Sequence, residues 1–203
     1  MDISRRALQQ LDRPGRRLVE ADLAQPLGQI AAASDAVLAL DVIEHIDDDR
    51  APVARLGMLV RPGGALIVSV PALPALFTEF DAIQGDAIQG HRRRYLPETL
   101  GAAFADSGLL LDRIFWWGRW LVPALRRHRA SPRSRPGQTP SEIYRHYLEL
   151  PPWPLPWVAK LAFLFEHGPA LRGLLRTGTS LFAVARRHFD RAPPSVCLAK
   201  LPT

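Results

Sequence analysis

Short apolar runs alternate along the chain with longer segments of helical character. The runs predict five strands, at residues 17–21, 36–40, 65–70, 109–117 and 179–185. The run 36–40 (AVLAL) is continuously apolar, which is typical of a strand buried on both faces. Because strands that alternate with helices need crossover connections, the pattern predicts an open α/β sheet with parallel strands.

The segments between these runs supply the helices. Helices are predicted at residues 3–11, 48–60, 97–107, 141–150 and 155–175. Ser4 is expected to cap the first helix, and Gly108 is expected to occupy the C′ position at the end of the third. Residues 123–139 are rich in Arg, Ser, Pro and Gly, which predicts a mobile loop.

Composition narrows the class of protein. The chain has 203 residues, 47% of them hydrophobic and 23% charged, which suits one globular domain and excludes wholesale disorder. Its formal net charge is +6 and comes almost entirely from arginine, which binds phosphate and carboxylate groups well, although a codon-usage bias explains it equally. The arginine-rich stretch lacks interleaved aromatic residues, so nucleic acid is not an expected partner. The single Cys197 excludes an intramolecular disulfide, and no metal-ligand set is predicted.

The N-terminal residues carry no apolar leader, and no uninterrupted apolar run reaches the roughly 18 residues of a membrane span. A cytoplasmic location is therefore expected. Five tryptophans, among them Trp153 and Trp157, leave contact with a membrane surface open, although packing in a core or lid is the commoner role. No oligomeric state is predicted.

Residues 81–90 consist of two copies of DAIQG. Two copies of five residues are too short to form a solenoid. We interpret the repeat as a duplication that lengthens a loop, directly before a polar cluster at 91–95.

Two motifs at a defined spacing carry a family resemblance. The stretch DAVLALDVIEHIDDD at 35–49 is followed by RPGGALIVSVPA at 61–72. Together they resemble the class I S-adenosylmethionine-dependent methyltransferases. GHRRRY at 90–95 and GTSLFAVARR at 178–187 are similar to the same group.

The resemblance implies a Rossmann-like α/β domain at residues 1–190. A helical lid is inserted at about 120–177, before the last strand, and a loose tail follows at 191–203. No glycine-rich turn of the type E/D-x-G-x-G-x-G precedes Asp2, so the sheet is expected to be N-terminally truncated. One hypothesis is that residues 17–21 pair with residues 36–40 and thereby complete the sheet.

The same resemblance implies S-adenosylmethionine as methyl donor and assigns residues to it. Asp2 matches the acid that holds the ribose hydroxyls. Asp22 and Leu23 match the neighbourhood of the adenine, and Leu40 and Asp41 match the end of a strand beside the methionine part. Without the resemblance, Asp2 is a frayed polar terminus, Asp22 a turn residue and Asp41 a helix cap.

Three further side chains are candidates for catalysis. His45 could act as a general base near the transferred methyl group, or simply pack at a helix start. His91 and Tyr95 lie in a loop that the family places over the acceptor, where arginine ion pairs would equally anchor the loop. Glu44 is interpreted as solvent-facing or paired with an arginine.

The function implied is methyl transfer to a small-molecule acceptor, lipid-like in view of the tryptophan-rich lid. An inactive, methyltransferase-derived binding module without the glycine loop is the alternative. A nicotinamide-dependent enzyme is disfavoured because G-x-G-x-x-G is absent.

Overall fold

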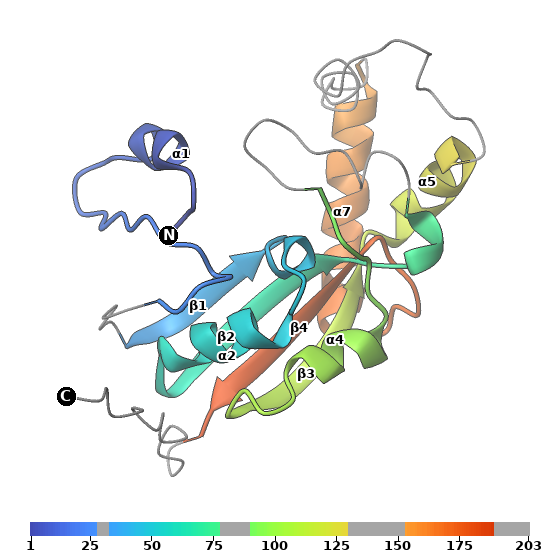
Figure 1. Ribbon diagram of the computed structural model, residues 1–203. Helices are drawn as coiled ribbons and strands as arrows, with labels where there is room; N and C mark the ends of the chain where they lie inside the picture. The colour runs from blue at the N-terminus through green and yellow to red at the C-terminus, as the bar shows by residue number, and fades with distance from the viewer. Residues whose placement is uncertain (28–32, 78–89, 130–152, 189–203) are drawn as a thin grey trace, which may run out of the picture.

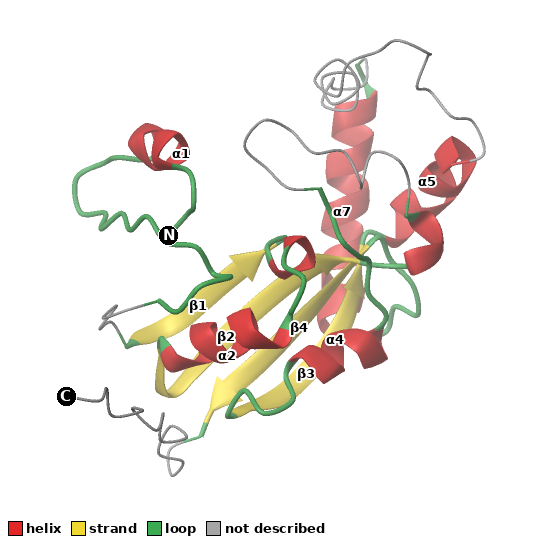
Figure 2. Cartoon of the chain, in the orientation of Figure 1, coloured by secondary structure: helices red, strands yellow, loops and turns green. Residues whose placement is uncertain are grey.

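A computed structural model describes residues 1–27, 33–77, 90–129 and 153–188. It contains one sheet with helices on both faces (Figure 1; Figure 2 colours helices and strands separately). The strands are β1 (Ser34–Leu40), β2 (Val60–Pro71), β3 (Leu109–Trp117) and β4 (Ser180–Arg187). The helices are α1 (Arg5–Gln10), α2 (Arg50–Met58), α4 (Pro97–Ala103), α5 (Val122–Arg129) and α7 (Leu155–Leu171), with short 3-10 turns η1 (Ile43–His45), η2 (Pro74–Leu76) and η3 (Arg119–Leu121).

The strand order is β1-β2-β4-β3. β1 and β2 pair in parallel through the crossover helix α2, as the alternating pattern predicted. β4 runs antiparallel to both β2 and β3. It follows that β1, β2 and β3 share one direction, so their carboxyl ends meet at the same edge of the sheet (Figure 1).

The sequence Arg-Pro-Gly-Gly at 61–64 lies inside β2 rather than before it. The β1–β2 register shifts here, because Ser34 pairs with Val60 whereas Ala36 pairs with Ala65. A Cβ atom on Gly64 would lie 2.8 Å from the carbonyl oxygen of Asp35, a contact that side chains do not tolerate. The glycine therefore allows the two strands to approach each other closely.

The two faces of the sheet are covered by different helices. α2 and α4 pack on one face and α7 on the other (Figure 1). Leu66, Val68 and Val70 of β2 belong to the larger core on the α2 side. Ile67 and Phe115 belong to a smaller cluster on the α7 side. Successive side chains of a strand point to opposite faces of the sheet, so both sets of β2 residues must be apolar when helices cover both faces.

β1 departs from the prediction that it is buried on both faces. Only Ala39 is buried, whereas Leu38 and Leu40 are 60% and 52% exposed. The reason is its place in the sheet: β1 is the edge strand beside β2, and α7 packs on β3 at the far end.

The predicted strand at 17–21 is wrong. In this part of the described chain only a single parallel bridge joins Asp2 to Glu20. The hypothesis that 17–21 pairs with 36–40 is also wrong, because the ladder of β1 is formed with β2. An apolar alternation becomes a strand only when a neighbouring strand accepts its hydrogen bonds.

Other local predictions are confirmed in part. Ser4 caps α1, its hydroxyl accepting from the N–H of Ala7 at 3.2 Å. The prediction for Gly108 is wrong, because α4 ends at Ala103 with Phe104 as its C-cap, so Gly108 (φ of 73°) lies in the turn before β3 rather than at C′. The prediction of a mobile loop at 123–139 is wrong for residues 123–129, because they belong to the helix α5. Residues 130–139 lie outside the described residues. The DAIQG repeat except Gly90, the predicted helix 141–150 and the tail 191–203 lie outside the described residues. No helix in the described ranges has both the length and the apolar character needed to cross a bilayer.

Candidate functional site

The candidate site begins at the carboxyl end of β1. Asp41 follows the strand directly and is exposed, in a left-handed backbone conformation with φ of 52°. Its N–H donates to the carbonyl oxygen of Ser69 at 3.0 Å and to the Ser69 hydroxyl oxygen at 3.2 Å. Because Ser69 belongs to β2, the parallel pairing of the two strands fixes Asp41 at the sheet edge.

Glu44 lies in η1 and is fully buried. Its interpretation as solvent-facing or paired with an arginine is wrong, since within the described residues neither carboxylate oxygen accepts a hydrogen bond. Burial is the main cause that raises the pKa of Glu44 to about 8. The negative charge of Asp41 also raises the pKa of Glu44. The backbone N–H of Glu44 lies close to the Glu44 carboxylate and lowers this pKa, although the contact does not have hydrogen-bond geometry.

Two histidines face this carboxylate. The Nε2 atoms of His45 and His91 lie 3.8 Å and 3.9 Å from Oε1 of Glu44. Their rings contact each other edge to face, with centroids 4.8 Å apart. The side chains are 24% and 25% exposed. The structure thus brings together two candidate residues that come from distant segments of the chain.

Hydrogen bonds to main-chain carbonyl oxygens hold the segment 91–95 against η1 and the residues that follow it. The N–H of Arg92 donates to the carbonyl oxygen of Glu44 at 2.8 Å. The guanidinium of Arg93 donates to the carbonyl oxygen of Asp47 at 2.6 Å. Because these acceptors are main-chain atoms, they fix the position of the neighbouring histidine independently of its own side chain.

Tyr95 ends this segment and is 1% exposed. Its hydroxyl donates to Oδ2 of Asp49 at 2.9 Å, and Arg93 lies 3.1 Å from the same oxygen. Burial, followed by the charge of Asp49, raises the pKa of Tyr95 above its ordinary range. These contacts anchor the segment, and contact of Tyr95 with a substrate stays a prediction.

The parallel bridge pairs Asp2 with Glu20, which lies two residues before Asp22 in the chain. Each of the two aspartates accepts a hydrogen bond from a backbone N–H two residues on, at 2.7 Å and 2.8 Å. Leu23 packs against the larger core, and its carbonyl oxygen accepts from Arg55 of α2 at 2.6 Å. Among these candidates, Leu23 is therefore the residue that is held on the α2 side of the sheet.

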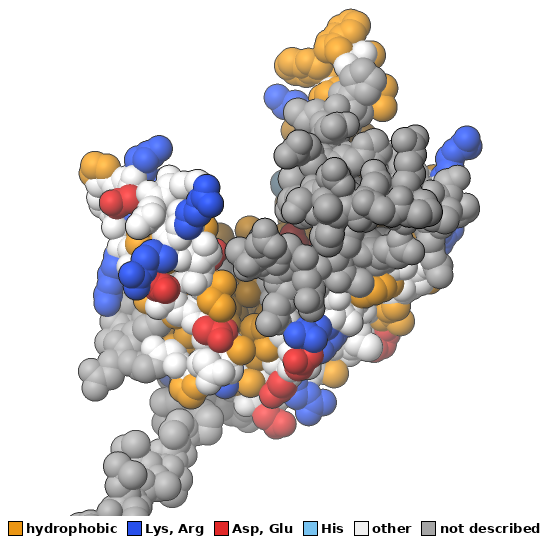
Figure 3. All heavy atoms as spheres, turned by 45° about the horizontal axis from the view of Figure 1, so that its top comes forward, with side chains coloured by type: hydrophobic (Ala, Val, Ile, Leu, Met, Phe, Trp, Pro, Cys, Tyr) orange, Lys and Arg blue, Asp and Glu red, His pale blue; other side chains and the backbone are white. Residues whose placement is uncertain are grey.

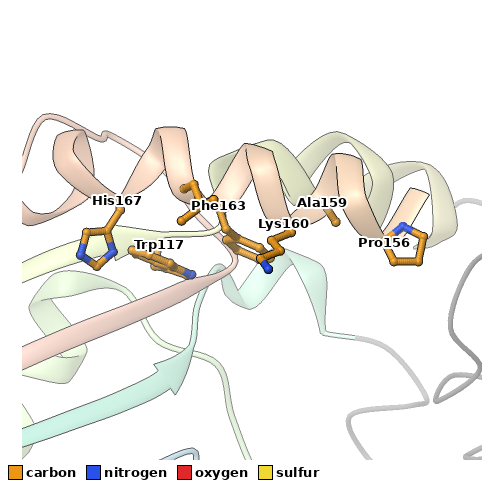
Figure 4. Close-up of a pocket in the computed structure, with 7 residues that line it drawn as sticks. Trp117, Pro156, Ala159, Lys160, Phe163 and His167 are labelled. Atoms are coloured by element: carbon orange, nitrogen blue, oxygen red, sulfur yellow. The ribbon is translucent and has the colours of Figure 1, made fainter. Parts of the chain in front are cut away.

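A pocket lies where α7 crosses the carboxyl end of β3. It is an open pocket of about 520 Å³ with a mainly apolar lining. Figure 4 shows Trp117 and His167 at one end of it and Pro156 at the other. Phe163 stacks on Trp117 with ring centroids 5.8 Å apart. The lining residues are Trp117, Pro156, Ala159, Lys160, Phe163, Leu164 and His167.

Glu166 fixes α7 to this edge and was missed by the sequence analysis. Its side chain is buried, and Oε1 accepts from the backbone N–H groups of Gly118 and Arg119 at the end of β3. The one signal available was an acidic residue inside an apolar helical run. Glu44 carried a weaker signal, because acidic residues also stand three positions before and after it, at Asp41 and Asp47.

The chain was compared with known protein families, curated proteins and solved structures. No known family profile matches the sequence, and no curated protein matches it. Among solved structures, a protein assigned as a methyltransferase from Bacillus halodurans C-125 matches with a TM-score of 0.51 at 11% identity. The match covers 92% of this chain and 81% of that one.

Two further structures match less closely. An O-methyltransferase family protein from Burkholderia thailandensis has a TM-score of 0.44 at 15% identity, over 85% of this chain and 36% of that one. A protein assigned as a sarcosine dimethylglycine methyltransferase from Galdieria sulphuraria has a TM-score of 0.45 at 13% identity, over 83% and 58%. The chain spans 36%, 60% and 55% of the first three structures that it matches. On the Bacillus match and the sheet described above, the chain has the Rossmann-like α/β fold of the class I methyltransferases.

Proposed function

We propose that this chain is a methyltransferase that carries a methyl group from S-adenosylmethionine to a small, largely apolar acceptor. The observation that carries the proposal is the β1–α2–β2 unit, in which Asp41 is exposed at the carboxyl end of a parallel strand pair. Ligands of open α/β sheets bind beyond these strand ends. The fold match supports methyl transfer as the reaction.

The side chains available at this edge suit the donor. S-adenosylmethionine supplies an electrophilic methyl group on a sulfonium, next to a ribose diol and an adenine. Asp2, the residue matched to the ribose, is an exposed carboxylate, and a carboxylate can accept two hydrogen bonds from a vicinal diol. Asp41, the residue matched to the methionine part, is exposed as well. Asp22 and Leu23 are held beside Asp2 by the Asp2–Glu20 bridge, so the predicted ribose and adenine contacts would lie close together.

The acceptor is inferred from α7. The pocket at the end of β3 is lined mainly by aromatic and aliphatic side chains, with Lys160 as its cationic member. Figure 3 shows hydrophobic side chains gathered at the end of α7 that projects away from the sheet. Trp153, which directly precedes the N-cap of α7, and Phe165, within the helix, are each 79% exposed. An apolar surface of this kind favours a lipid-like acceptor, and contact with a membrane surface and a cytoplasmic location stay predictions.

Titration calorimetry with S-adenosylhomocysteine tests the donor site. We expect the 203-residue chain to bind it, and Asp22→Ala to weaken binding roughly 10-fold to 100-fold, the loss of one hydrogen bond to a charged group. Asp112→Ala is the matched control, because Asp112 is an exposed aspartate on β3. If the unmodified chain does not bind, it is the inactive, methyltransferase-derived module instead.

Transfer of a labelled methyl group tests the acceptor class. The chain is incubated with labelled donor and separate fractions of lipid extract, RNA and protein. We expect label in the organic-extractable fraction, and less of it for Phe163→Ser, which removes an aromatic wall of the pocket. Label that is confined to RNA or protein would contradict a small apolar acceptor.

A further inference from the structure

We propose that Glu44, His45 and His91 form a binding site for one divalent transition-metal ion, of which Zn²⁺ is the representative. Each residue offers one ligand atom, and the three atoms lie within 4.8 Å of one another. The sequence predicts no metal-ligand set, and His91 lies far from the 35–49 motif in the chain. The proposal concerns binding alone and does not depend on methyl transfer.

The carboxylate of Glu44 is the strongest argument. It is 0% exposed, and within the described residues neither of its oxygens accepts a hydrogen bond. A buried polar group without a partner costs about 1–3 kcal/mol, and more when it is charged. A cation bound beside Oε1 would replace the missing partner and would balance the negative charge.

Neither histidine lies within hydrogen-bond distance of the Glu44 carboxylate. The separations from Glu44 Oε1 to the two Nε2 atoms, 3.8 Å and 3.9 Å, exceed the length of an N–H···O bond. Around a tetrahedral Zn²⁺ with bonds of about 2.0–2.1 Å, neighbouring ligand atoms lie roughly 3.4 Å apart. The two Glu44 contacts therefore need to shorten by roughly half an ångström, and the two imidazole nitrogens, which lie within 4.8 Å of each other, by up to about 1.4 Å.

The donor set selects the class of ion. Two imidazoles and one carboxylate are ligands that Zn²⁺ uses when a fourth position stays open. Mg²⁺ and Ca²⁺ prefer oxygen ligands, so two imidazoles disfavour them. The histidine side chains are about one quarter exposed, which leaves one side of the site accessible to water or to an oxygen-bearing ligand.

The protein backbone prepares this arrangement. His45 is adjacent to Glu44 in η1, and the N–H of Arg92 bonds to the carbonyl oxygen of Glu44 at 2.8 Å. This bond brings His91 to the same carboxylate. Asp41, whose charge acts on Glu44, adds a second negative group near the site and further favours a cation.

Titration of the chelator-treated, dialysed 203-residue chain with ZnCl₂ tests the proposal, in the absence of S-adenosylmethionine. We expect one Zn²⁺ per chain and no comparable binding of Mg²⁺. Glu44→Gln and His91→Ala should each weaken Zn²⁺ binding at least about 10-fold, since removing even an outer partner of a ligand costs that much. His188→Ala is the control, because this exposed histidine follows β4, outside the cluster.

Absence of binding, or binding that both Glu44→Gln and His91→Ala leave unchanged (an adventitious ion only), would overturn the site. Circular dichroism verifies that the variants are folded. The unmodified chain gives an independent readout with Co²⁺, which absorbs visible light strongly in four- or five-coordinate sites and weakly in six-coordinate sites at surface oxygens. A weak spectrum would contradict the proposed geometry even if a variant failed to fold.

Discussion

The end of β3 depends on Gly118, and Gly118→Ala tests how the sheet edge is built. Gly118 has φ of 79°, and its N–H donates to the buried Glu166. A Cβ atom placed on it would lie 2.3 Å from Oγ1 of Thr179. The substitution therefore combines two costs, a left-handed backbone for a residue with a side chain and a steric clash with the segment that leads into β4.

The two costs can be estimated separately. The left-handed conformation costs a non-glycine residue roughly 1–2 kcal/mol, and overpacking costs roughly 1–3 kcal/mol, so the loss of unfolding free energy is about 2–5 kcal/mol. Gly108→Ala is the matched control, because its φ is 73° and nothing lies within 4 Å of an added Cβ. It should therefore lose only about 1–2 kcal/mol.

Urea unfolding followed by tryptophan fluorescence measures both variants. A loss of about 3 kcal/mol lowers the midpoint by about 1.5 M at an m-value of roughly 2 kcal/mol/M, with the m-value itself unchanged. Thr179→Ala in the Gly118→Ala background should restore part of the loss, because the Thr179 Cβ lies at an ordinary 3.5 Å. The reasoning is refuted if Gly118→Ala is no more destabilising than Gly108→Ala, or if Thr179→Ala restores nothing.

Three further substitutions test other contacts. Tyr95→Phe removes the hydrogen bond to Asp49 and should lower the unfolding free energy by about 1–3 kcal/mol, as measured by urea titration. An unchanged unfolding midpoint would show that this hydrogen bond contributes nothing to stability. Glu166→Ala leaves two backbone N–H groups without their acceptor and should cost about 2–4 kcal/mol, with greater proteolytic cleavage near α7 than in the unmodified chain. In chelator-treated protein the pKa of Glu44 lies above its ordinary 4.5, at about 8, so its protonated form is favoured in the folded state. The unfolding free energy should therefore fall as pH rises from about 4.5 to about 8, and Glu44→Gln should flatten that fall in a pH series of urea titrations.

Local signals explain why some elements could be predicted closely. The apolar run 109–117 is bounded by Gly108 and Gly118, both of which have positive φ, and it became β3 with the same bounds. The start of α1 was predictable because Ser4 is a residue type that caps helices and it directly precedes the helical segment. In both cases the determining residues are neighbours in the sequence, so no tertiary contact had to be known.

The elements that failed depend on contacts between distant segments. Residues 17–21 have the apolar alternation of a strand, but a strand forms only with a partner, and the structure supplies one bridge at Glu20. The run 36–40 is apolar enough for a central strand, yet its burial depends on which strands and helices lie beside it. Sequence periodicity carries no information about that arrangement.

The candidate site likewise contains residues that the sequence could identify and residues that it could not. Asp41 was predictable because it directly follows an apolar run, and strand ends are where ligands bind in such sheets. The burial of Glu44 could not be predicted from the sequence, because this burial depends on the segment 91–95, which folds over η1 and bonds to it through Arg92. His91 was a candidate only through the family resemblance, and its position facing Glu44 became visible only in the structure.

The strand order also constrains the acceptor under the proposed function. Asp41 follows β1, whereas the apolar pocket adjoins Trp117 at the end of β3, on the same edge of the sheet. Two strands, β2 and β4, separate them, so the two ends lie three strand spacings apart. At about 4.8 Å per spacing this is roughly 14 Å across the sheet. A compact polar metabolite would reach only one of the two, so an acceptor that uses both must be elongated, with an apolar portion against α7 and its methyl-accepting atom near the end of β1.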